Sequence, residues 1–153
     1  MRKGSSMGQS AQHHDIVIIG AGPAGLGFAR ALADTGLDMV LVERQPLSVL
    51  ETPPNDGRDI ALTHTSETLM KDLGLWDHIP ADEIDTIRDA KVVDVTDPYA
   101  LHFAAQETGA DYLGRIVPNH LIRQAAFEAV KEAPNVTLLT EKTVTGVETD
   151  ARA

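Results

Sequence analysis

The pattern of apolar and polar residues is clearest between Asp15 and Arg44, where an apolar run, a glycine-rich turn, an amphipathic segment and a second apolar run follow one another. The run Ile16 to Ile19 is continuous, which is typical of a parallel strand with helices on both faces. The amphipathic segment predicts a helix ending near Gly36, followed by a strand over residues 38–43. The expected inward stripe of this helix is Leu26, Ala29, Leu32 and Ala33.

The spacing of apolar residues later in the chain predicts two further helices and a third parallel strand. We expect helices from about Thr65 to Leu73 and from about His120 to Lys131, the second with Asn119 as its N-cap. Residues Val136 to Thr140 predict the third strand, and residues 143–148 resemble the start of another. The side chains expected to face inward on the first of these helices are Leu69, Met70 and Leu73.

Two segments depart from this alternation of strands and helices. Residues Gln45 to Asp59 carry many turn-forming residues and predict a loop, whose length is unusual in a compact domain unless the loop has a function. Residues 91–95 and 99–104 predict an antiparallel hairpin with its turn around residues 97–98. We therefore expect residues 84–112 to begin a second sheet.

The composition narrows the class of protein. With 42% hydrophobic and 24% charged residues among 153, the chain has the composition of an ordinary soluble domain, and its net charge of -10 argues against a nucleic-acid partner. No apolar run approaches the roughly 20 residues of a membrane span, so no transmembrane segment is expected and the cytoplasm is the default compartment. Residues 1–14 are polar and aperiodic, and we interpret them as a disordered leader or a cloning remnant. The absence of cysteine excludes disulfides.

The glycine-rich turn carries the first candidate chemistry. Gly20, Gly22 and Gly25 have the Gly-x-Gly-x-x-Gly spacing, which allows a tight turn, the approach of a diphosphate and close packing of the helix on the sheet. Pro23 stands in the first helical turn, where its missing N–H costs nothing. Glu43 lies 18 residues after the third glycine, close to the spacing of a carboxylate that binds a ribose. The turn therefore predicts a dinucleotide site, the alternative being a turn that only packs a helix tightly.

A diphosphate also needs local positive charge, because the global charge of the chain is screened beyond a Debye length of about 8 Å. The candidates are Arg44, Arg58, Arg115 and Arg123. Arg58 ends the predicted loop and either reaches the ligand or lies on a solvated turn. No titratable pair stands out as acid and base, so no catalytic residue is named, and no ligands have the spacing of a metal site.

Five motifs together resemble a known family. They are GAGPAGL after the first strand, LVER ending at Arg44, and DGRDIAL, LGLWD and LGRIVPNHLIRQA later in the chain. Together they resemble the FAD-dependent aromatic hydroxylases, nearest the ubiquinone-biosynthesis type, the UbiH/VisC-like monooxygenases. The resemblance implies FAD as the bound dinucleotide, NAD(P)H as a transient reductant, O2 as the oxidant and an aromatic small molecule as substrate, a ubiquinone-precursor ring among the candidates. A quinone-precursor substrate would also imply peripheral contact with a membrane.

The resemblance implies roles for individual residues. The glycine turn and its helix would hold the diphosphate, Glu43 the adenosine ribose, and Arg44 would lie beside the adenosine half. Arg58 would match the family arginine near the diphosphate and flavin, and Asn119 would lie on the flavin side, with or without a capping role. Arg123 is a further candidate, expected on the exposed side of the same helix. The implied cofactor-binding residues are Gly20, Gly22, Pro23, Ala24, Gly25, Glu43, Arg44, Arg58, Asn119 and Arg123.

The resemblance covers only the N-terminal portion of such an enzyme, because the later Gly-Ala-Asp-Gly and Gly-Asp segments of the family have no counterpart here. It implies an α/β fold: an incomplete, Rossmann-like, three-layer FAD-binding domain over residues 15–153, with 84–112 contributing to an antiparallel substrate-domain sheet. The strands over 38–43 and 136–140 would lie on one side of strand 16–19. Its other edge would be open, which predicts self-association or pairing with another piece of the same protein.

Two other functions remain open from the sequence. One is a nicotinamide-binding Rossmann oxidoreductase, in which Glu43 would also bind a ribose. The other is a non-enzymatic nucleotide-binding module that is complete at this length. If the chain is part of a hydroxylase, we expect the 153 residues alone to be inactive.

Overall fold

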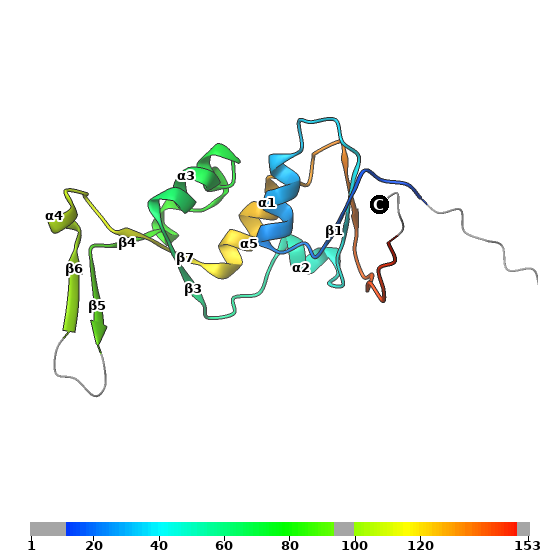
Figure 1. Cartoon of the computed structure of the whole chain (residues 1–153). Helices are drawn as coiled ribbons and strands as arrows, with labels where there is room; N and C mark the ends of the chain where they lie inside the picture. Colours follow the sequence, from blue (N-terminus) through cyan, green and yellow to red (C-terminus); the bar gives the residue numbers. More distant parts are fainter. Residues whose placement is uncertain (1–11, 94–99, 150–153) are drawn as a thin grey trace, which may run out of the picture.

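A parallel sheet of three strands lies at one end of the molecule, where Figure 1 labels β1. The structure is a computed structural model, and it describes residues 12–93 and 100–149. The strands are β1 (Ile16–Ile19), β2 (Met39–Val42) and β8 (Val136–Leu139), in the order β1-β2-β8. The predicted parallel strands are therefore confirmed, and the second and third lie on the same side of the first.

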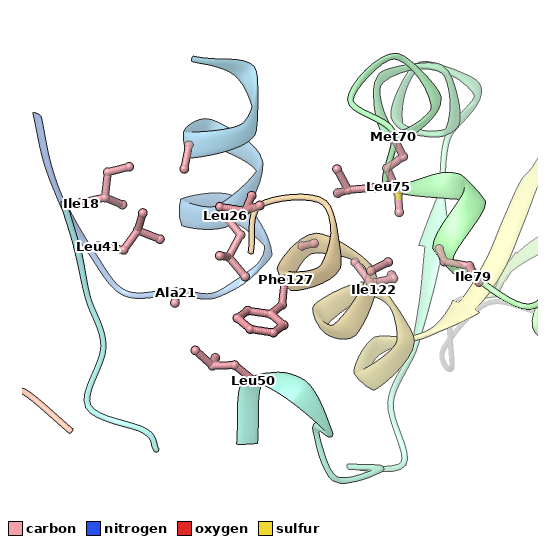
Figure 2. Packing of buried hydrophobic residues seen from close by; sticks show 14 of the residues in the cluster. Ile18, Ala21, Leu26, Leu41, Leu50, Met70, Leu75, Ile79, Ile122 and Phe127 are labelled. Carbon is pink, nitrogen blue, oxygen red and sulfur yellow. The ribbon is translucent and has the colours of Figure 1, made fainter. Parts of the chain in front are cut away.

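Helices cover one face of this sheet. They are α1 (Pro23–Ala31), α2 (Leu47–Glu51) and α5 (Asn119–Glu128), and α1 packs against α5. Alternate strand residues point to the same face, so Ile18 and Leu41 meet Leu26 and Phe127 in the core (Figure 2). The core of this α/β unit thus consists of one stripe from each helix and every second residue of each strand.

The opposite face of β1 is not covered in the same way. Val17 and Ile19 expose 59% and 60% of their surface, although the continuous apolar run predicts cover on both faces. Among the described residues, β1 pairs with β2 alone, so its outer edge has free backbone donors and acceptors. The physical reason is that no described helix or strand lies beyond β1.

A second sheet, antiparallel, was not predicted in full. Its strands are β3 (Asp59–Leu62), β4 (Asp85–Ile87) and β7 (Gly114–Pro118), in the order β3-β7-β4. Gly114 permits the close approach of β3, because a Cβ there would lie 2.4 Å from the carbonyl oxygen of Leu62. The sequence did not indicate this sheet, since each of its strands is too short to show a period.

Helix α3 (His64–Asp72) follows β3 and is close to its predicted bounds. Thr63 is its N-cap and accepts a hydrogen bond from the Ser66 amide at 3.2 Å. Met70 is buried as expected, but Leu69 is 56% exposed, so its predicted inward direction is wrong. Two short 3-10 helices, η1 (Trp76–His78) and η2 (Ala81–Glu83), connect α3 to β4.

The predicted hairpin is confirmed for the part that the structure describes. Strands β5 (Asp89–Val93) and β6 (Ala100–Ala104) pair antiparallel, and helix α4 (Ala105–Thr108) follows. The predicted turn at residues 97–98 lies outside the described residues, as does most of the predicted leader, residues 1–11. Figure 1 shows the hairpin at the end of the molecule opposite the parallel sheet.

Four further local predictions are wrong. Helix α1 ends at Ala31 with Leu32 as its C-cap, so Gly36 lies in the following turn. The predicted loop contains α2, because Leu50 finds a buried position. Asn119 is the first residue of α5 and not its N-cap, which is Pro118. Residues 143–148 form no strand, since no described strand lies beside them to pair with.

The described residues include no helix that is both long enough and apolar enough to cross a bilayer.

Candidate functional site

The glycine turn between β1 and α1 has the geometry that the sequence predicts. Gly20 has a φ of +100°, which disfavours any other residue, and its amide donates to the Val42 carbonyl at 2.9 Å. A Cβ on Gly25 would lie 2.1 Å from the carbonyl oxygen of Gly20, so the helix packs directly on the turn. A Cβ on Gly20 or Gly22 would meet nothing within 4 Å, which leaves the outer side of the turn open.

The amino end of α1 lies at this open side. Gly22 is the N-cap with extended backbone, Pro23 is the first helical residue, and Ala24 is exposed. The first intrahelical bond runs from the Leu26 amide to the Gly22 carbonyl at 2.9 Å. The amides of Ala24 and Gly25 therefore have no partner within the helix and, together with the helix dipole, favour an anion.

Glu43, directly after β2, is joined to the glycine turn. Its carboxylate accepts hydrogen bonds from the amides of Ala21 and Gln45, each at 2.8 Å. Burial raises the pKa of the Glu43 carboxyl, but the amides of Gln45, Ala21 and Arg44 and the Arg44 charge outweigh it, so the pKa lies below its ordinary value. Glu43 thus stays ionised beside the turn, with lone pairs left for a ligand hydroxyl.

A shallow pocket of about 250 Å³ opens beside Glu43. Gly20, Glu43 and Arg44 form one wall, and Lys142 and Val144 form the other. The Lys142 amide donates to the Glu43 carbonyl at 2.9 Å, which fixes this second wall. The pocket lies at the carboxyl ends of parallel strands, where open α/β sheets bind ligands.

A larger pocket of about 430 Å³ lies on the helix side of the sheet, away from the glycine turn. Its lining is mixed, with the apolar Leu41 and Phe127 beside charged residues such as Glu132. Lys131 at its rim pairs with Glu128, which leaves this cation partly neutralised. The glycine turn lies instead at the smaller pocket, which Gly20 and Glu43 line.

A second group of predicted residues gathers around Asp56. Arg58 donates to Asp56 Oδ2 from Nε at 2.9 Å and from Nη2 at 2.5 Å, and Asn119 Nδ2 donates to the same oxygen at 2.7 Å. These hydrogen bonds, from Arg58 first and then Asn119, hold the pKa of Asp56 well below its usual range. The Arg58 side chain is 66% exposed, and its partner Asp56 is hydrogen-bonded to Asn119 at the start of α5.

The other candidate arginines differ in their surroundings. Arg123 is half-buried on α5, four residues after Asn119 and so on the same helix face. Arg115 does not contact the residues around Asp56. Its guanidinium lies over the Tyr112 ring, 4.1 Å from the centroid. It donates hydrogen bonds to Thr86 Oγ1 at 2.7 Å and to Glu67 at 3.4 Å. Arg115 is thus part of a structural cluster on α3 and β7.

The sequence missed two features of the site. Its pattern presents Asp56 only as a turn former, whereas the carboxylate links two candidate residues that lie far apart in the chain. Lys142 is not among the predicted residues, although it lines the pocket beside Glu43. The available signal for Asp56 was a carboxylate two residues before a candidate arginine. No pattern in the sequence indicates that Lys142 lines the pocket.

The turn, the helix and the carboxylate after the second strand define the class as a dinucleotide-binding α/β domain. The family model described as FAD binding domain matches residues 13–152, and the chain belongs to this family. The dinucleotide that this family binds is FAD.

The relatives point to the same class. The chain is 51% identical over 141 residues to ubiquinone hydroxylase UbiM of Neisseria meningitidis, covering 90% of this chain and 31% of the relative. It is 32% identical over 147 residues to ubiquinone hydroxylase UbiL of Rhodospirillum rubrum, covering 96% and 34%. The chain thus spans about a third of the length of these relatives.

Solved structures support the fold. PqsL of Pseudomonas aeruginosa, in complex with 2-aminobenzoylacetate, superposes with a TM-score of 0.72 at 21% identity, covering 92% of this chain and 37% of that one. At this identity the likeness concerns the fold alone. It agrees with the α/β class predicted from the sequence.

The residues of the turn fit FAD. The space outside Gly20 and Gly22, the unpaired amides at the start of α1 and the ionised Glu43 suit a diphosphate next to a ribose. Each carboxylate oxygen of Glu43 already accepts one backbone amide, from Ala21 and from Gln45.

Proposed function

We propose that this chain is the N-terminal part, residues 15–153, of an FAD-dependent monooxygenase that hydroxylates an aromatic ring with NAD(P)H and O2. The observation that carries the proposal is the 51% identity to a ubiquinone hydroxylase over 141 residues. A ubiquinone-precursor ring is accordingly the proposed substrate class.

In this proposal the chain binds one part of the cofactor. Gly20, Gly22, Ala24 and Gly25 hold the diphosphate, because the space outside Gly20 and Gly22 is open and the amides of Ala24 and Gly25 have no partner within the helix. Pro23 sets the first helical turn without removing a needed donor.

Further residues bind the sugar and the far half of the cofactor. Glu43 accepts a hydrogen bond from the adenosine ribose, and Arg44 lies beside the adenosine in the 250 Å³ pocket. Arg58, Asn119 and Arg123 are the groups we assign to the diphosphate and flavin side. The side-chain exposure of Arg58, 66%, supports its availability to a ligand.

Bound FAD would supply the redox chemistry, taking electrons from NAD(P)H and passing them to O2. The protein residues described above bind and orient the cofactor. The buried apolar residues under α1 and α5 hold the strands and helices that carry these residues in fixed positions. A flavin ring must be held in a fixed position to react.

We also propose that residues 84–112 contribute to a substrate-domain sheet. The hairpin β5–β6 projects from the rest of the chain (Figure 1). It also exposes large apolar side chains. A lone two-stranded hairpin is marginally stable in water, so such a surface favours addition of further strands. These exposed residues are Val92, Val93, Leu101 and Phe103.

The outer edge of β1 supports a second assembly proposal. Its unpaired backbone groups and the exposed Val17 and Ile19 favour addition of a strand, from another copy of the chain or from another segment of the same protein. We keep the cytoplasm as the proposed compartment, and a lipophilic quinone precursor as substrate would bring the protein to a membrane surface.

The test uses the whole protein that carries this chain. The purified protein should be yellow with bound flavin, should oxidise NADH or NADPH faster when a prenylated phenol is added, and should place one atom of 18O2 in the product ring. A colourless protein that binds NAD tightly would support the nicotinamide alternative. Flavin binding without substrate-stimulated oxidation or ring labelling would overturn the hydroxylase proposal.

A further inference from the structure

The carboxylate of Asp56 is the centre of the second residue group. Its Oδ2 accepts from Arg58 Nε at 2.9 Å, from Arg58 Nη2 at 2.5 Å and from Asn119 Nδ2 at 2.7 Å. Its Oδ1 accepts from the Arg58 amide at 3.2 Å. One side chain therefore contacts both candidate residues.

The backbone around Asp56 is fixed from two directions. Within the loop, the Asn55 side chain accepts from the Gly57 amide at 2.8 Å, and Gly57 has a φ of +69°. Across the fold, the Asn119 amide donates to the Arg58 carbonyl at 2.8 Å. The loop is thus attached to the first residue of α5 by a backbone hydrogen bond and a side-chain hydrogen bond.

This attachment determines which edge of Arg58 is available. The guanidinium uses Nε and one N–H of Nη2 for Asp56, and its remaining donors have no role in that contact. The Arg58 side chain is 66% exposed, against 26% for Asp56. The free edge of the guanidinium therefore faces outward, where an anionic group can approach it.

We propose that Asp56 is a positioning residue that holds the guanidinium of Arg58, between the loop and α5, in the orientation that binds the anionic part of the cofactor. The inference rests on the proposed function, because it takes FAD as the ligand. Asp56 itself does not contact the ligand. It lowers the conformational entropy that Arg58 loses on binding, since the side chain is already oriented in the free protein.

The negative charge of Asp56 has the opposite effect on FAD affinity. A carboxylate beside an arginine also reduces the net positive charge that a diphosphate meets, so removal of Asp56 would tighten binding if charge outweighed orientation. We expect orientation to outweigh charge, because Arg58 is exposed and its charge is screened by water and salt.

The test is a double-mutant cycle on FAD affinity in the whole protein that carries this chain, with the dissociation constant measured by flavin fluorescence. Asp56→Ala should weaken FAD binding roughly three- to tenfold, the range expected for one immobilised side chain. Arg58→Ala should weaken it at least as much. The double variant should be no weaker than Arg58→Ala alone, because Asp56 acts through Arg58.

The matched control is Asp59→Ala, which removes an exposed carboxylate one residue after Arg58. It should not weaken FAD binding. Asp56→Asn keeps an acceptor oxygen and should restore part of the affinity lost in Asp56→Ala. Unchanged or tighter FAD binding by Asp56→Ala would overturn the proposal. So would a double variant whose loss of FAD affinity equals the product of the losses in the two single variants.

A second readout needs no cofactor. In the FAD-free protein, hydrogen exchange at Arg58 Nε should be slow by 15N NMR and should become fast in Asp56→Ala. Fast exchange in the unaltered protein would overturn the proposal even if FAD binds. If the protein binds no FAD although this exchange is slow, the proposed function is wrong and FAD is not the ligand of Arg58. The hydrogen bond between Asp56 and Arg58 would still be confirmed by the slow exchange.

Discussion

The position that a Cβ on Gly25 would occupy lies 2.1 Å from the carbonyl oxygen of Gly20, closer than any such contact in a real protein. Helix α1 therefore lies against the glycine turn, so the size of the residue at position 25 sets the position of the helix end. The proposed diphosphate site depends on this close approach.

Gly25→Ala should therefore damage both stability and cofactor binding. We expect the free energy of unfolding to fall by about 2 kcal/mol or more, as for other overpacked sites, and FAD binding to be lost. Gly27→Ala is the matched control, because a Cβ at Gly27 meets nothing within 4 Å. It should stabilise α1 by about 0.5–1 kcal/mol. Chemical denaturation and flavin titration check both, and equal behaviour of the two variants would contradict the explanation.

Glu43→Gln should loosen the contact between the glycine turn and β2. A glutamine cannot accept from both the Ala21 and Gln45 amides, so we expect a loss of about 1–2 kcal/mol in unfolding free energy and weaker FAD binding. Glu83→Gln, at an exposed position, is the control. Urea denaturation at pH 7 measures the difference, and no loss for Glu43→Gln would show that the two amide contacts are not stabilising.

The acid sensitivity of the fold should depend on Glu67. Burial raises the pKa of this carboxyl, but the hydrogen bonds from Lys71 and Tyr112 and the charges of Lys71 and Arg115 outweigh it, so the pKa lies below its ordinary value of 4.5. A lowered folded-state pKa adds stability that is fully present above the unfolded-state pKa and is lost as the pH falls through the folded-state value. The loss should therefore begin below about pH 4.5.

Glu67→Gln should remove this pH dependence. Because Glu67 is only 4% exposed and accepts from Lys71 at 2.7 Å and Tyr112 at 3.0 Å, we expect a loss of about 2 kcal/mol at pH 7. Melting temperatures from pH 3 to 7 give the measurement, with Asp72→Asn on the same helix as the control. If the variant and the unaltered chain lose stability in parallel on acidification, Glu67 is not the responsible group.

The edge of β1 should control the association state of the 153-residue chain by itself. Ile19→Lys places a charge on an edge strand, which disfavours strand addition, so the average mass in sedimentation experiments should fall toward that of a monomer. Leu37→Lys, another exposed apolar position, should leave the mass unchanged. A monomeric unaltered chain at all concentrations would contradict pairing of copies through this edge.

Much of the fold could be predicted because the signals were local. The strand at Ile16 to Ile19, the helix after Gly22 and the strand at Val136 each depend on periodicity or on glycine chemistry within a few residues. Leu69 shows the limit of prediction from periodicity. Its position in the apolar pattern predicts an inward side chain, but in the structure this side chain is exposed.

The sequence by itself determined the parallel strands, the glycine turn and the acidic residue after β2, because spacing along the chain specifies each of them. Only the tertiary structure decided that Asp56 lies between Arg58 and Asn119, that Glu67 is buried beside Arg115, and that β3 pairs with β7. These contacts join residues tens of positions apart. The physical reason is that such a hydrogen bond depends on the whole path of the chain between its partners, which no local pattern records.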